Sequence, residues 1–137
     1  PTWTWIATVV LFIIIIWLSS VPRVLTGEEE EAAMPVAPAF ARFVEDVHFD
    51  AARDVVLSRC SMCHAQEPVW EGIVVAPNGV LLETDAEIAA QAREIYLQAG
   101  RSHAMPPANI TFIEPAERRL LVAWFESAVA AKSRPDQ

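Results

Sequence analysis

The N-terminal part of the chain is continuously apolar, and residues 1–22 contain no charged side chain. Its centre reads WIATVVLFIIIIWL, and with its flanks it offers about twenty residues, enough for a helix to cross a bilayer core of roughly 30 Å. Trp3, Trp5 and Trp17 lie near the two ends of this run, where indole rings favour the lipid headgroup region. A secretory signal peptide would show a basic start and a small-residue cleavage site, and neither is convincing here. The pattern therefore predicts a transmembrane helix over residues 1–22.

A polar and proline-rich segment follows the apolar run. Glu28 to Glu31 form a run of four acids, and Pro35 and Pro38 come soon after it. Like charges extend a chain, and proline blocks helical hydrogen bonds. We therefore expect an acidic and Pro/Ala-rich linker over residues 23–47. The apolar residues by which its second half can pack on a folded domain are Phe40, Phe43 and Val44.

Helical periodicity dominates the rest of the chain. A first helix is expected to begin near Asp50, which is a favourable N-cap residue. A second helix begins at the capping box Thr84–Glu87 and runs to about Gln98, and a last one opens at Pro115. The apolar positions that recur at helical spacing are Val55, Val56, Ile88, Ala92, Ile95, Ala99, Leu120, Leu121, Trp124, Phe125 and Ala128. The pattern predicts an all-α domain of three to four helices over residues 48–137.

The candidate chemistry is concentrated in the stretch Cys60-Ser61-Met62-Cys63-His64. This C-x-x-C-H spacing is the attachment motif of a c-type haem, in which each thiol bonds one porphyrin vinyl group and the histidine ligates the iron. A structural disulfide, half of a zinc site or a thioredoxin-like redox pair would use the same two cysteines. A zinc site needs a second Cys/His pair, and a redox pair needs a βαβ context, and the sequence shows neither. The motif therefore favours one covalent haem c on Cys60 and Cys63, with His64 as proximal ligand, ahead of a disulfide or dithiol.

A methionine followed by two prolines provides a candidate for the sixth iron ligand. Met105 stands before Pro106 and Pro107 and follows the second expected helix. A thioether is a soft, neutral ligand that favours Fe(II), and rigid prolines would hold such a weak iron–sulfur bond in place. His103 is the rival ligand, and ordinary packing in the core is the other role open to Met105. We take Met105 as the distal ligand.

With these motifs and a final amphipathic helix, the chain resembles the class I cytochromes c. The resemblance implies a small helical domain folded around one haem, with single-electron transfer as its activity and no catalytic site of its own. In that family a proline carbonyl about a dozen residues past the histidine accepts the imidazole N–H, and Pro77 matches that position. Trp70 would cover a haem edge or bond a propionate, although simple packing accounts for it equally well.

A longer string of motifs narrows the resemblance. His64-Ala65-Gln66-Glu67-Pro68-Val69-Trp70-Glu71-Gly72, Ala76-Pro77-Asn78-Gly79-Val80 and the segment from Gly100 to Pro107 are similar to the cytochrome c part of bacterial membrane-bound urate oxidases. The resemblance implies that residues 1–22 match the last membrane span of that family. It also implies that the urate chemistry lies on other spans, from which this haem would accept electrons and pass them to a downstream cytochrome or terminal oxidase.

Charge and topology complete the expected setting of the protein. The sequence has 10 basic and 18 acidic residues and a net charge of −8, which argues against nucleic acid as a partner and allows a basic redox protein. Arg23 alone would favour a cytoplasmic C-terminus, whereas the cytochrome resemblance implies haem attachment outside the bacterial cytoplasm. We therefore expect a single span in the bacterial inner membrane, in contact with lipid, and a haem domain on the periplasmic side.

Two classes of function stay open at this point. The first is the electron-accepting module of a membrane-bound urate oxidase. The second is an independent anchored cytochrome c that carries electrons to or from a respiratory or photosynthetic complex. A sensor or gas-binding haem protein is a weaker third class, because it would need an open sixth position on the iron.

Overall fold

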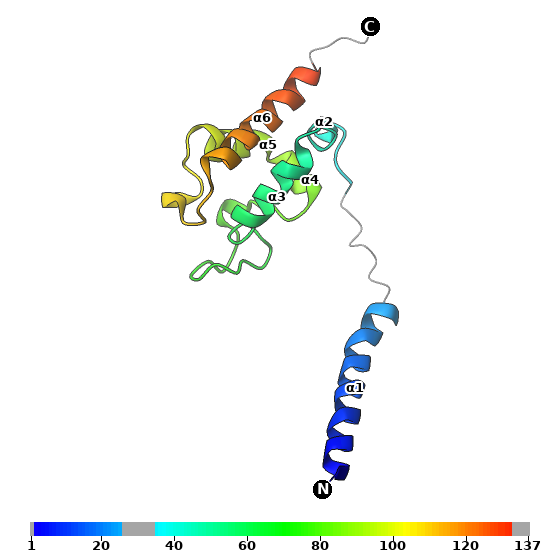
Figure 1. Ribbon diagram of the computed structural model, residues 1–137. Helices are drawn as coiled ribbons and strands as arrows, with labels where there is room; N and C mark the ends of the chain where they lie inside the picture. Colours follow the sequence, from blue (N-terminus) through cyan, green and yellow to red (C-terminus); the bar gives the residue numbers. More distant parts are fainter. Residues whose placement is uncertain (1, 26–34, 133–137) are drawn as a thin grey trace. The chain divides into compact units, whose positions relative to one another are not determined.

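The computed structural model describes residues 2–25 and 35–132, which fall into two compact units (Figure 1). The first unit contains one helix, α1 (Thr2–Leu25), and the second contains all the other helices. No strand occurs among the described residues. The helices of the second unit are α2 (Ala41–Val44), α3 (Phe49–Arg59), α4 (Asp85–Ala90), α5 (Ala92–Glu94), η2 (Ile95–Arg101) and α6 (Pro115–Lys132), with short 3₁₀ turns η1 (Pro77–Gly79) and η3 (Pro107–Asn109).

Helix α1 corrects the expectation of a membrane span. In the part of the chain that the structure describes, no helix is both long enough and apolar enough to cross a bilayer. The transmembrane helix predicted over residues 1–22 is therefore wrong. The single-span localisation in the bacterial inner membrane, with a periplasmic haem domain, is wrong with it.

Helix α2 lies in the segment that the sequence analysis assigned to the linker, of which residues 26–34 fall outside the described residues. Phe43 is buried there, and its backbone carbonyl accepts a hydrogen bond from Trp124 Nε1 at 2.8 Å. The Phe43 ring also meets Trp124 edge-on at 5.9 Å and stacks on Phe125 at 5.6 Å. Aromatic pairs of this geometry add to the stability that burial alone supplies. Residues 41–44 therefore belong to the folded core.

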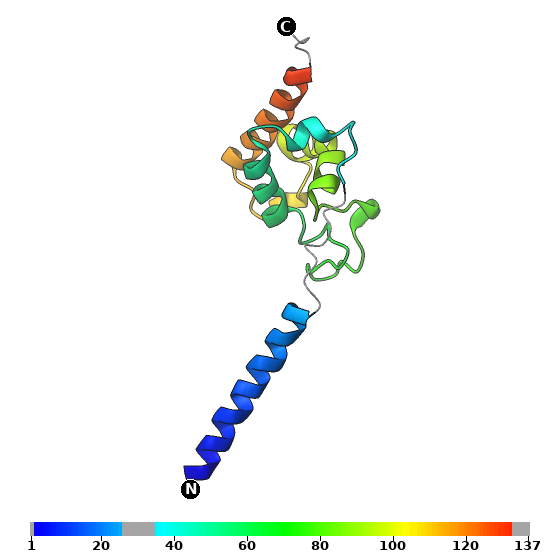
Figure 2. The ribbon, with the colours of Figure 1, turned by 90° about the vertical axis from the view of Figure 1, so that its right-hand side faces the viewer.

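Helices α3 and α6 pack against each other in that core, and Figure 2 shows both within the second unit. Helix α3 begins one residue before Asp50, with His48 at the N-cap. The His48 N–H donates a hydrogen bond to Asp46 Oδ1 at 2.9 Å. Asp50 thus lies in the first turn, where its carboxylate interacts favourably with the positive end of the helix dipole. The buried apolar residues that the two helices contribute are Phe49, Ala52, Val55, Val56, Leu121, Trp124 and Ala128.

The middle helix begins as predicted but does not run on as one α-helix. Thr84 and Glu87 form both hydrogen bonds of the capping box, which confirms the predicted start. The helix then breaks at Gln91, and its last turns are a π-helix, η2. Gly100 in η2 packs so closely on α6 that a Cβ atom there would lie 2.8 Å from Val122 Cγ2. The wider π turn and the missing side chain together allow η2 and α6 to approach closely.

Candidate functional site

A cavity of about 360 Å³ brings the motif residues of the sequence together, and we call it the Cys60–Met105 cavity. Cys60, Cys63, His64 and Met105 all line it. Its volume falls within the range of small-molecule and cofactor sites. The other lining residues are Arg59, Asn78, Val80, Leu82, Gln91, Glu94, Ile95, Gln98, Ala99, Pro106, Pro107 and Thr111. Two thiols, an imidazole and a thioether therefore share one largely apolar cavity.

The end of helix α3 places the two cysteines and the histidine on one turn. Cys60 is the C-cap residue, and its N–H bonds the Val56 carbonyl at 2.8 Å. The Cys60 carbonyl then accepts hydrogen bonds from the N–H groups of Cys63, at 3.1 Å, and His64, at 3.0 Å. Both cysteines are free thiols rather than a disulfide. This turn keeps the three residues close together in the backbone, and all three line the cavity.

The protonation of the two thiols argues against a reactive dithiol. Burial, with a smaller contribution from Cys63, raises the pKa of the Cys60 thiol to about 12. Burial also raises the pKa of Cys63 above its ordinary value. Redox-active and metal-binding cysteines have a lowered pKa, because the thiolate is the reactive species. Thiols with raised pKa values do not match the activated cysteine of a thioredoxin-like pair.

His64 is oriented by a backbone carbonyl that the sequence analysis did not choose. Its Nδ1 lies 3.0 Å from the carbonyl oxygen of Val80. The Pro77 carbonyl instead accepts the Val80 N–H at 3.2 Å, within η1, so Pro77 is not the partner of the imidazole. A hydrogen on Nδ1 leaves the Nε2 lone pair free to bind a metal. The Leu82 N–H also bonds the His64 carbonyl at 2.8 Å, which fixes the histidine at a second point.

Met105 lines the same cavity from a segment about forty residues further along the chain, and the rival ligand His103 does not line it. The Met105 N–H bonds the Gln98 carbonyl at 3.0 Å, at the end of the middle helix. His103 is exposed, has a φ of 58°, and lines a different cavity, of about 770 Å³, next to Arg118. The structure therefore brings Met105, and not His103, to the cavity that His64 lines.

Trp70 is not brought to the cavity. It is half-buried in the long loop after His64, and its backbone N–H bonds the Met62 carbonyl at 3.1 Å. The indole is not among the groups that line the Cys60–Met105 cavity. The part expected of Trp70, covering a cofactor edge, therefore has no support in this geometry.

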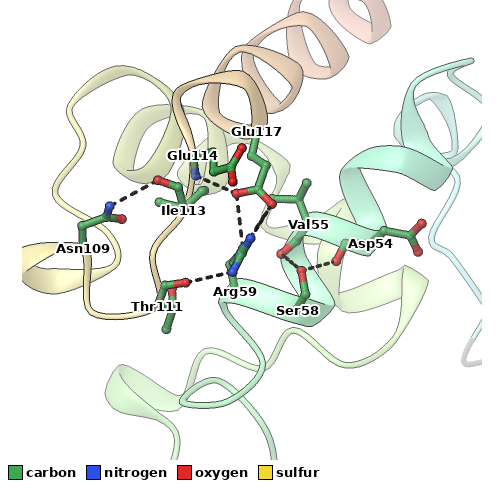
Figure 3. A network of polar contacts seen from close by, with 9 residues as sticks. All are labelled: Asp54, Val55, Ser58, Arg59, Asn109, Thr111, Ile113, Glu114 and Glu117. Atoms are coloured by element: carbon green, nitrogen blue, oxygen red, sulfur yellow. Dashed lines mark hydrogen bonds and ion pairs between the residues drawn. The ribbon is translucent and has the colours of Figure 1, made fainter.

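An ion pair that no sequence pattern predicted joins Arg59, which lines the cavity, to Glu117 (Figure 3). Arg59 donates from Nε and Nη2 to Glu117 at 3.0–3.2 Å, and from Nη1 to the Thr111 carbonyl at 3.1 Å. Glu117 also accepts the Glu114 N–H at 2.6 Å. Burial pushes the pKa of Glu117 upward, but this backbone bond and Arg59 outweigh it, so the pKa lies below its ordinary value. The pair joins α3 to α6. Local sequence patterns do not predict a contact between residues that lie 58 positions apart in the chain.

No family model, curated protein or solved structure matches this chain. The function proposed below therefore depends on the site and on the motifs that line it.

Proposed function

We propose that this protein is a monohaem c-type cytochrome that transfers single electrons. The observation that carries the proposal is that Cys60, Cys63, His64 and Met105 line one cavity. Haem c needs two thiols for its vinyl groups, an imidazole and a second axial ligand, and this donor set supplies all of them. The bound haem would supply an iron that alternates between Fe(II) and Fe(III).

The thiols suit covalent attachment by addition. Each S–H would add across one vinyl C=C bond, so that sulfur bonds one vinyl carbon and the proton goes to the other. The addition balances without an oxidant or a reductant. Cys60 and Cys63 are free thiols on one turn beside His64, which supports simultaneous attachment and ligation. The raised pKa of both thiols agrees with cysteines that are consumed in thioethers rather than used as thiolates.

The residues around the two axial ligands would determine their properties. The Val80 carbonyl bonds His64 Nδ1 at 3.0 Å, which holds the ring orientation and raises the basicity of Nε2. The Met105 thioether favours Fe(II), which raises the reduction potential. Apolar side chains of Val80, Leu82 and Ile95 line the same cavity and lower its polarity. Six-coordinate iron leaves no position for a substrate, so we propose electron transfer without a catalytic site.

Covalent attachment is tested on the purified protein. The parent chain, run on a denaturing gel, is expected to keep its haem peroxidase stain. A Cys60→Ala/Cys63→Ala variant should lose the stain, and Met62→Leu, which changes the residue between the two cysteines, should keep it. A parent protein whose stain washes out under denaturation would contradict the proposal.

For the electron donor, we propose a urate-oxidising partner, and the support is the motif string from His64 to Gly72 and from Gly100 to Pro107. The test is anaerobic addition of urate to a preparation that contains the full assembly, while the haem α-band is followed. Reduction of the haem by urate is the expected result. Reduction only by quinol-linked or light-driven donors would instead assign the protein to a respiratory or photosynthetic complex.

A further inference from the structure

Arg118 is a buried cation in the first turns of α6, close to the loop that carries Met105. Its residue surface is only 7% exposed, whereas the neighbouring Arg119 is exposed. No carboxylate of the described residues forms an ion pair with Arg118. A buried charge is costly unless strong hydrogen bonds compensate for the lost water. Arg118 is therefore stabilised in this position by hydrogen bonds to neutral acceptors.

The acceptors of Arg118 belong to three successive segments. Nη1 donates to the Ala99 carbonyl of η2 at 2.6 Å and to the Met105 carbonyl at 2.9 Å. Nη2 donates to Asn109 Oδ1, in η3, at 3.1 Å. The planar guanidinium presents its donors in a fixed fork, which suits it to join several acceptors at once. Arg118 thus ties α6 to both ends of the Met105 loop.

Both backbone polar groups of Met105 are hydrogen-bonded, and Arg118 holds one of them. Its N–H bonds the Gln98 carbonyl at 3.0 Å, and its carbonyl accepts from Arg118. Asn109 in turn donates from Nδ2 to the Ile113 carbonyl at 3.2 Å, which fixes the far end of the loop (Figure 3). The guanidinium therefore holds the Met105 carbonyl and, through Asn109, the far end of the loop that carries Met105.

We propose that Arg118 is a positioning residue for the iron-binding thioether of Met105, an inference that rests on the proposed cytochrome function. Arg118 fixes the Met105 peptide so that Sγ is presented to the cavity. Without the guanidinium, the Met105 carbonyl and Asn109 lose their common donor and the loop gains freedom. An iron–sulfur bond is weak, so freedom in the loop lowers its occupancy.

The experiment measures how strongly Met105 holds the iron in the haem-loaded protein. Imidazole added to the oxidised protein competes with Met105, so its apparent affinity rises when the methionine is held less firmly. Losing one charge-assisted hydrogen bond to the loop should tighten imidazole binding about tenfold in Arg118→Gln. The weak near-infrared Met–Fe(III) band should decrease and the reduction potential should fall. Arg118→Lys, which keeps the charge but loses the fork, should show an intermediate effect.

Arg119→Gln is the matched control, because it removes the same charge one residue away on an exposed side chain. A parent protein without the Met–Fe(III) band would overturn the Met105 ligation, and this inference with it. A parent that has the band, with an Arg118→Gln variant that binds imidazole within about twofold of the parent, would overturn only the role of Arg118. The same holds if Arg119→Gln has as large an effect.

A second variant keeps the test decisive if Arg118→Gln fails to fold. Asn109→Gly removes one acceptor of the guanidinium, and glycine tolerates the φ of 55° at this position. A smaller rise in imidazole affinity, about threefold, is expected from it. An unchanged affinity in folded Asn109→Gly would overturn the proposal.

Discussion

The ion pair between Arg59 and Glu117 should contribute measurably to stability, because it joins the helix that carries the cysteines to α6. Glu117→Gln removes the charge of the acceptor and keeps its shape. The carboxylate receives two donors of Arg59 at 3.0–3.2 Å and the Glu114 N–H at 2.6 Å. All of these bonds have an ionised acceptor in the parent protein, whereas in the variant the acceptor is a neutral amide and the ion pair with Arg59 is lost.

The expected magnitude follows from the exposure of the pair. The side chains of Arg59 and Glu117 are 29% and 21% exposed, which is more sheltered than an ordinary surface ion pair. Hydrogen bonds to charged groups contribute about 1.5–3 kcal/mol each, and partial exposure reduces that value. We expect Glu117→Gln to lower the free energy of unfolding by about 2 kcal/mol at neutral pH. This loss corresponds to a midpoint roughly 8 °C lower for a domain of this size.

The pH dependence gives the sharper test. The pKa of Glu117 lies below its ordinary value in the folded protein, because the Glu114 N–H and Arg59 outweigh the effect of burial. Such a carboxyl stabilises the fold above its unfolded pKa, near 4.5, and the stabilisation is lost as the pH falls through the folded pKa. Urea unfolding of parent and variant at several pH values should give a constant difference above this pKa and a shrinking one below it.

The pair between Arg93 and Glu94 provides the control, since its side chains are 71% and 50% exposed. Glu94→Gln should change the free energy of unfolding by less than about 0.5 kcal/mol at any pH in the series. A Glu117→Gln variant as stable as the parent at neutral pH would refute the reasoning. So would a difference that persists undiminished at the lowest pH.

Three further substitutions test the packing of the helices by thermal or urea unfolding of the haem-loaded protein. Thr84→Ala should cost about 1 kcal/mol, because it removes the acceptor of the capping box; an unaltered midpoint would contradict that role. Gly100→Ala should cost about 1–3 kcal/mol, because its Cβ would lie 2.8 Å from a side chain of α6; a neutral effect would mean that η2 and α6 separate easily. Trp124→Phe should cost about 1–3 kcal/mol, because it leaves the buried Phe43 carbonyl without its donor, and a cost below 0.5 kcal/mol, about the size of a surface substitution, would show that the bond contributes little.

Local patterns in the sequence predicted the features that are built from neighbouring residues. The capping box at Thr84, the start of α6 at Pro115 and the apolar faces of the helices all depend on groups within a few positions of one another. The same locality explains the errors. The apolar count over residues 1–22 predicted a span, but no described helix is long and apolar enough to be one. The periodicity of the middle helix does not register the break at Gln91 or the π turns after it.

By itself the sequence determined which residue types are available for chemistry: two thiols and an imidazole at the spacing of one turn, and a methionine followed by two prolines. Only the tertiary structure decided which of them meet. It put Met105 and not His103 in the cavity that His64 lines, gave Val80 and not Pro77 to the imidazole, and joined Arg118 to the Met105 loop. The physical reason is that a hydrogen bond between distant segments forms only after loop closure and helix packing have set their separation. A one-dimensional pattern carries the chemistry of each donor, and the packed chain determines its acceptor.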